Sequence, residues 1–119
     1  MNCIGIDTSN YTTSAALVKG GEVLVNSKKL LPVRPGEMGL RQSDAVFHHV
    51  QQMNEVLRPV FAAGGDLHAV GVSTRPRAVE GSYMPCFTVG VTVARALAES
   101  HGVPLHEFSH QQGHIAAAL

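Results

Sequence analysis

The stretch NCIGIDTSNYTTSAALVK, residues 2–19, carries the pattern that decides the fold class. Residues 2–7 are mostly apolar and end at Asp7, which predicts a buried strand that opens into a polar loop. Residues 12–19 predict a second strand. Two glycines follow it and accept positive φ angles, so we expect a hairpin into a third strand over residues 22–28. The chain is therefore expected to begin with three antiparallel strands.

The rest of the sequence alternates between helical and strand patterns. Ser43 and Asp44 offer N-cap chemistry for a first helix, which Pro59 should kink or end near Arg58. Its buried face is expected to carry the apolar residues spaced three or four apart: Val46, Phe47, Val50, Met53, Leu57, Val60 and Phe61. The later elements are expected to be a buried parallel strand at 69–73, a helix at 87–100 closed by Gly102, a strand at 104–109 and a helix at 110–119.

The resulting order, β-β-β-α-β-α-β-α, predicts an α/β fold with a mixed five-stranded sheet. This is the pattern of a ribonuclease-H-like (actin-like ATPase) lobe. A chain of 119 residues has the size of one domain, so residues 1–119 are expected to form a single lobe. The fold occurs in nucleases and as one lobe of sugar kinases, actin and chaperone ATPases, so it assigns no function by itself.

Composition excludes several classes of function. Nine basic and nine acidic side chains cancel, so no broad positive field attracts nucleic acid, and a polyanion has to be bound locally. No apolar run is long enough to span a bilayer, and the amino terminus lacks a leader pattern, so no membrane role is expected. Cys3 and Cys86 lie in apolar segments and fit small buried thiols in a reducing cytoplasm.

The loop after the first strand is the first candidate site. It contains Asp7, Thr8, Ser9, Asn10 and Thr12. Hydroxyls and backbone amides can bind the phosphate oxygens of a nucleotide, and the Asp carboxylate can hold a hydrated divalent cation. The alternative is a polar turn whose side chains cap their own backbone. The pattern leaves both interpretations open.

The second candidate is the pair His110 and His114, which a spacing of four brings to one face of a helix. Two imidazoles so placed can bind one transition metal ion, although two ligands alone make a weak site. The alternative is a capping His110 with an exposed His114. Position 111 is Gln, which cannot serve as the general base of a zinc peptidase, so a metallopeptidase is disfavoured.

A nuclease of this fold is also disfavoured. It would need carboxylates converging on two metal ions, and Glu55 could supply one from the first helix. Arg75 and Arg77, however, follow the fourth strand where another carboxylate belongs. These two arginines could instead attract an anion to the start of the next helix, or they could simply be solvated.

Three segments resemble one family: Ile4-Gly5-Ile6-Asp7-Thr8-Ser9, the helix over residues 90–98, and the closing Ser109-His110-Gln111-Gln112-Gly113-His114. This is the universal tRNA threonylcarbamoyladenosine synthase family, long labelled O-sialoglycoprotein endopeptidase or glycoprotease. The resemblance runs in order through nearly the whole chain and corresponds to the family's amino-terminal lobe.

The resemblance implies transfer of a threonylcarbamoyl group from its adenylate to an adenosine next to the tRNA anticodon. It implies that His110 and His114 bind iron or zinc together with an Asp from a second lobe, with ATP or threonylcarbamoyl-adenylate as the ligand of the complete protein. The expected partners are that second lobe or a second copy of the chain, tRNA, and family partner proteins. The isolated chain is expected to be inactive.

Two departures from the family pattern indicate a divergent member. Arg75-Pro76-Arg77 replaces the usual Gly-Pro-Gly turn, and residues 40–49 differ from the usual opening of the first helix. The alternative function is a non-catalytic interaction module, although such relatives generally lack the histidine pair. Because Leu119 falls inside an apolar helical pattern, we expect the chain to be the amino-terminal half of a longer two-lobe protein.

Overall fold

The computed structural model describes residues 1–9, 11–32, 41–75 and 85–109. These residues form a mixed sheet and two helices. In chain order the elements are β1 (Asn2–Asp7), β2 (Thr12–Lys19), β3 (Glu22–Leu30), α1 (Gln42–Ala62), β4 (Ala69–Arg75), α2 (Phe87–His101) and β5 (Leu105–Ser109). The helix expected over residues 110–119 lies outside the described ranges.

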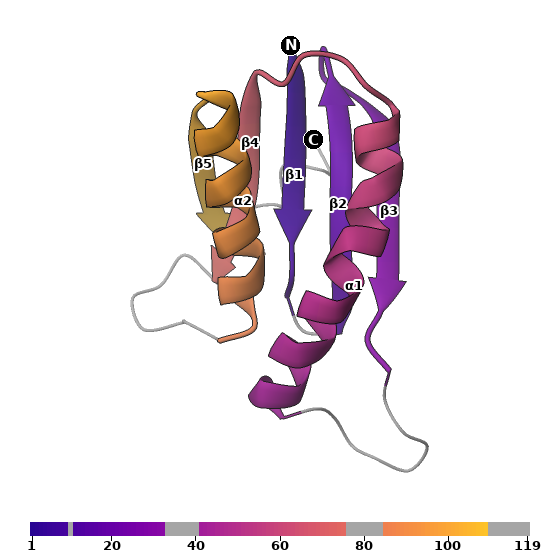
Figure 1. Ribbon diagram of the computed structural model, residues 1–119, viewed down its shortest axis with the longest axis vertical. Helices are drawn as coiled ribbons and strands as arrows, with labels where there is room; N and C mark the ends of the chain where they lie inside the picture. The colour runs from indigo at the N-terminus through magenta and orange to yellow at the C-terminus, as the bar shows by residue number, and fades with distance from the viewer. Residues whose placement is uncertain (10, 33–40, 76–84, 110–119) are drawn as a thin grey trace.

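The five strands lie in the order β3-β2-β1-β4-β5 (Figure 1). The first three pair antiparallel, whereas β4 is parallel to β1 and β5 is parallel to β4. This mixed topology is that of a ribonuclease-H-like lobe and confirms the fold class predicted from the sequence.

Glycines end two elements where the sequence predicts. Gly20 and Gly21 join β2 to β3 with φ angles of 57° and 82°, a conformation that side chains disfavour. Gly102 follows α2 with a φ of 63° in the left-handed region, and its amide bonds the Glu99 carbonyl. β3 continues two residues beyond the expected end, because Leu30 still pairs with Thr12.

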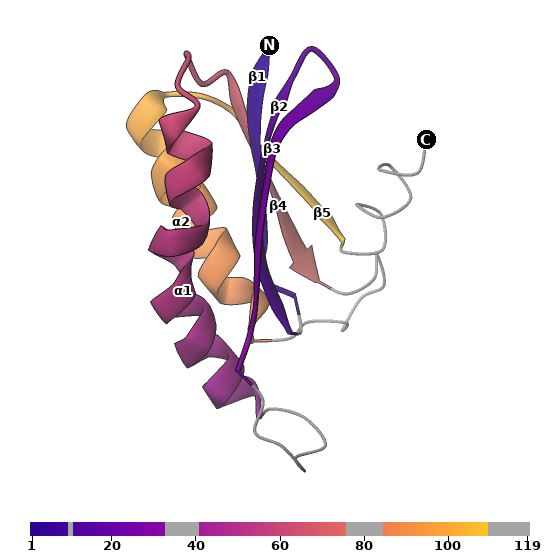
Figure 2. The ribbon, with the colours of Figure 1, turned by 90° about the vertical axis from the view of Figure 1, so that its right-hand side faces the viewer.

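Both helices cover the same face of the sheet, as Figure 2 shows with the sheet edge-on. α1 packs on β2 and β3, and α2 packs mainly on β4 and β1. Because side chains alternate along a strand, every second residue of β1, β2 and β4 points into this core. The core consists of Ile4, Ile6, Ala15, Leu17, Met53, Val56, Leu57, Val60, Val70, Val72, Val89, Ala94 and Ala98. Neither helix in the described ranges is long and apolar enough to cross a membrane.

The ends of α1 differ from the prediction. Arg41, with an extended backbone, precedes the first helical residue, and no side chain caps this end. The N-cap predicted at Ser43 or Asp44 is therefore wrong, since both residues lie inside the first turn. The helix also does not end near Arg58 but continues through Pro59 to Ala62. Near a carboxyl end, the missing amide of a proline costs only one hydrogen bond of the last turns.

The buried face of α1 also differs from the predicted one. Phe47, Val50 and Phe61 are 58%, 60% and 48% exposed. Two polar side chains, His49 and Gln52, are buried in their place. They bond polar atoms on the sheet, and these bonds fix the helix in a rotation that the apolar spacing alone did not predict.

Candidate functional site at the carboxyl ends of the parallel strands

The candidate site lies at one edge of the sheet. Because β1, β4 and β5 run parallel, their carboxyl ends at Asp7, Arg75 and Ser109 meet at this edge, at the lower end of the sheet in Figure 1. Only β4 separates β1 from β5, so these two strands lie about 10 Å apart. The hydroxyl-rich loop begins directly after Asp7, and His110 is the residue after Ser109.

The loop after β1 starts with a turn closed by its own side chain. Asp7 Oδ1 accepts a hydrogen bond of 2.8 Å from the Ser9 amide. Ser14 Oγ donates to the Asp7 carbonyl at 3.3 Å, and the Thr12 amide donates to the Ser9 carbonyl at 3.3 Å. Ser9 is buried, Asp7 and Thr12 are half-buried, and Asn10 lies outside the described residues. The loop therefore contains the self-capping turn that is one of the two interpretations of its sequence.

Thr8 joins β1 to the start of α2. Its side chain is fully buried, and Oγ1 donates to the Cys86 carbonyl at 2.9 Å while accepting from the Gly90 amide at 3.1 Å. A Cβ at position 90 would lie 2.9 Å from the same oxygen, so only glycine fits without displacement. Sequence reasoning gave Thr8 a phosphate-binding role and missed this structural one, for which the glycine inside the helical pattern was the available signal.

Replacing Thr8 with valine is expected to lower the free energy of unfolding by about 1–3 kcal/mol, because two hydrogen bonds of about 0.5–1.5 kcal/mol each are lost. Thr8→Ser keeps the hydroxyl and should recover most of this loss. Urea unfolding followed by circular dichroism measures both variants. A large loss for the serine variant together with little loss for the valine variant would mean that the methyl group, and not the hydroxyl, stabilises the contact with α2.

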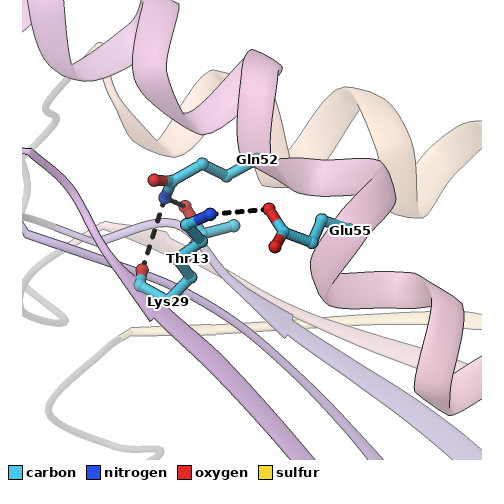
Figure 3. A network of polar contacts seen from close by, with 4 residues as sticks. All are labelled: Thr13, Lys29, Gln52 and Glu55. Carbon is cyan, nitrogen blue, oxygen red and sulfur yellow. Dashed lines mark hydrogen bonds and ion pairs between the residues drawn. The ribbon is translucent and has the colours of Figure 1, made fainter.

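The helical carboxylate considered for metal-dependent nuclease chemistry is already paired with a lysine. Glu55 on α1 pairs with Lys29 of β3 at 2.7 Å, and Figure 3 shows this pair beside Gln52. Arg75 donates to Thr74 Oγ1 at 3.1 Å and is half-buried. Arg77 lies outside the described residues, so its suggested role toward an anion stays a prediction.

The two cysteines have the environments expected of structural thiols. Cys86 is fully buried before α2, and Cys3 is half-buried in β1. Burial raises the pKa of the Cys3 thiol above its ordinary value of 9.0. The thiolate, which is the reactive form, is therefore disfavoured at neutral pH.

His110 and His114 both lie outside the described residues. The described part of the chain reaches the end of β5 at Ser109, which lies at the same edge as the hydroxyl-rich loop. Among the described residues, no three His, Cys, Asp or Glu side chains form a group that could hold a metal ion.

Comparison with solved structures gives the class of this lobe. A Pseudomonas aeruginosa protein, described as uncharacterized with similarity to the peptidase YEAZ, superposes with a TM-score of 0.62. It is 19% identical, and the match covers 91% of this chain and 43% of that one. Together with the observed topology, this similarity makes the chain a lobe of the ribonuclease-H-like, actin-like class.

Sequence comparison gives the family. The model of the family described as "TsaD: tRNA N6-adenosine threonylcarbamoyltransferase" matches residues 22–119, and the chain belongs to this family. The enzyme of that name from Geobacillus kaustophilus is 39% identical in an alignment of 122 residues that covers 96% of this chain and 34% of the relative. The Pyrobaculum calidifontis enzyme is 33% identical over 97% of this chain and 33% of its own length. The chain thus spans about a third of the length of these relatives.

Proposed function

We propose that this chain is the amino-terminal lobe of a metal-dependent threonylcarbamoyltransferase that modifies tRNA in the cytoplasm. The observation that carries the proposal is the shared edge of the sheet, where the loop after β1 and the end of β5 meet in a chain of this family. Membership in the family supports the reaction, and the shared edge supports a single site formed by the two sequence candidates.

In this proposal the hydroxyl-rich loop holds the phosphates of ATP or of threonylcarbamoyl-adenylate. Asp7, Ser9, Asn10 and Thr12 contribute polar groups and backbone amides. Thr8 contributes through its backbone and by fixing the loop against α2, because its hydroxyl already bonds Cys86 and Gly90. Loop and helix start are thereby held in one position before a ligand arrives.

The two histidines that follow β5 in the sequence are donors that fit a metal ion of the iron or zinc type. His110 and His114 offer two imidazole nitrogens, the ligand type that both metals accept in proteins. When bound, the metal would polarise a carbonyl or phosphoryl oxygen of the ligand as a Lewis acid. The two histidines would hold and orient that ion, and a third ligand is expected from the second lobe or from another chain.

The partners in this proposal are a second lobe or a second copy of the chain, tRNA, and proteins of the kind that act with the family. A non-catalytic interaction module is the alternative. The similarity to the YEAZ-like protein from Pseudomonas aeruginosa concerns the fold alone and does not favour that alternative. The two histidines favour the catalytic lobe, because a module without chemistry has no need of paired metal ligands.

The test uses cells depleted of their own threonylcarbamoyltransferase. The complete reading frame that encodes this chain should restore threonylcarbamoyladenosine in tRNA, measured by mass spectrometry of nucleosides, whereas the 119-residue chain alone should not. His110→Ala with His114→Ala should reduce restoration by at least about tenfold, and exposed His106→Ala should leave it unchanged. Restoration that does not depend on the histidine pair would favour the interaction module.

A further inference from the structure

A cavity of about 360 Å³ lies between the two helices, at the opposite end of the sheet from the candidate site. It is next to Asn2, where β1 begins, whereas the hydroxyl-rich loop follows the end of β1 at Asp7. The length of the strand separates the two places by about 17–20 Å. Figure 1 shows both helices ending at this upper end of the molecule, beside the amino terminus. The cavity is therefore distinct from the proposed threonylcarbamoyl site.

The inner walls of the cavity are apolar. Ile4 and Leu17 contribute from the sheet, Val60 from α1 and Leu97 from α2. The volume lies in the range of natural small-molecule sites, about 300–1,000 Å³. Such walls favour a ligand with an aliphatic or aromatic body, because binding removes the apolar surface of that ligand from water.

The rim of the cavity carries a carboxylate and lies beside two helix carboxyl ends. Asp66 lines it and is exposed, and both helices end beside it at Ala62 and His101. Helix carboxyl ends carry partial negative charge on their last carbonyls, and α1 has no basic residue in its last turn to offset it. His101 lies on the α2 side, and its Nδ1 is 3.0 Å from the Leu97 carbonyl.

The backbone around the rim is held in place before any ligand binds. The Asn2 amide donates to His68 Nδ1 at 2.9 Å, and the His68 amide donates to the Asn2 carbonyl at 2.9 Å. Gly64 and Gly65 have φ angles of 71° and 94°, so the turn after α1 uses a conformation that other residues rarely adopt. A Cβ at Gly65 would lie 2.7 Å from Asn2 Nδ2. A preformed site loses little freedom on binding.

We propose that this cavity binds a small organic cation with an apolar body. The body packs against Ile4, Leu17 and Leu97, and the ammonium group lies at the rim near the Asp66 carboxylate and the helix ends. Neutral and anionic molecules of the same shape bind more weakly, because the rim offers negative charge and carbonyl acceptors.

The test compares three probes that share one body: 4-phenylbutylammonium, 4-phenylbutanol and 4-phenylbutyrate. Each is titrated into the ¹⁵N-labelled 119-residue chain at pH 8, where histidine side chains are in general uncharged. The ammonium probe should bind with a dissociation constant on the order of 1 mM, as expected for a ligand of this size. It should shift the amides of Leu67 and Leu97, and it should bind about three- to fivefold more tightly than the alcohol.

Variants separate the charge of the rim from the shape of the cavity. Asp66→Asn should reduce the preference for the ammonium probe, whereas Asp44→Asn, an exposed acid in the first turn of α1, should not. Leu97→Trp fills the cavity and should abolish binding of all three probes, and exposed Ala96→Trp on the same helix should not. If the Leu97→Trp variant does not fold, the comparison of Asp66→Asn with Asp44→Asn still tests the proposal. Equal affinity for the three probes, shifts away from the cavity, or no binding up to about 10 mM would overturn the proposal.

Discussion

Replacing both His110 and His114 with alanine is expected to weaken the binding of iron or zinc by this chain by more than about 100-fold. Removal of a residue that only supports a metal ligand already costs about 10–100-fold in affinity, and here the ligands themselves are removed. Competition with a chromophoric chelator measures the affinity for the metal in solution, so the protein does not have to retain its metal during chromatography. Each single substitution should cause most of the loss, because one imidazole cannot hold the ion alone.

The matched control is a double variant of two exposed histidines in the described part of the chain, His101→Ala with His106→Ala. It removes the same number of imidazoles and should leave the affinity within about twofold of the original. If both double variants lose metal to the same extent, binding is a general property of a chain with seven histidines and the proposed metal site is wrong.

The order of strands and helices could be predicted because each element has a recognisable pattern within its own stretch of sequence. The apolar run into Asp7, the glycine pair after β2 and the short apolar β4 each have one plausible structure, and the mixed sheet follows from their order. The directions of the strands follow from their connections, since a helix leads into each of the parallel strands β4 and β5 and a hairpin joins antiparallel β2 and β3.

The candidate site was predictable in its position but not in its bonding. That a polar loop follows a buried strand can be read from residues 7–14, and its place beside the end of β5 follows from the topology. The sequence does not show which hydroxyls already take part in hydrogen bonds within the protein. Thr8 and Ser9 look alike in the sequence, yet Thr8 bonds α2 while the amide of Ser9 bonds Asp7. This difference depends on where α2 packs, which is a tertiary contact across 78 residues of sequence.

The rotation of α1 was not predictable from spacing for a related reason. Apolar periodicity favours the stripe with Phe47, Val50 and Phe61, but the sheet beneath the helix presents polar partners. Gln52 Nε2 donates to Thr13 Oγ1 at 3.2 Å and to the Lys29 carbonyl at 3.4 Å, as Figure 3 shows. Burying these polar sheet atoms under apolar side chains would leave them without hydrogen bonds. The free-energy cost of that loss is larger than the cost of exposing a few apolar side chains to water.

His49→Ala is therefore expected to destabilise the fold strongly, by about 3 kcal/mol. His49 is fully buried, and its Nδ1 shares a hydrogen bond of 2.7 Å with Thr13 Oγ1, itself fully buried. Alanine removes the ring, leaves a cavity, and takes a partner from a buried hydroxyl, and large-to-small changes in cores cost about 2–5 kcal/mol. Urea unfolding monitored by circular dichroism gives the free energy.

The neighbouring histidine supplies the control. His48 is half-buried, and its ring contacts Phe47 at the surface of α1, with centroids 5.5 Å apart. His48→Ala should cost about 1 kcal/mol or less. A double-mutant cycle with Thr13→Val isolates the buried bond, and a coupling of about 0.5–3 kcal/mol between Thr13 and His49 is expected. Equal costs for the two alanine variants, with no coupling to Thr13, would show that apolar contacts alone hold α1 on the sheet. In that case the polar pair would not explain why this helix turns two aromatic residues outward.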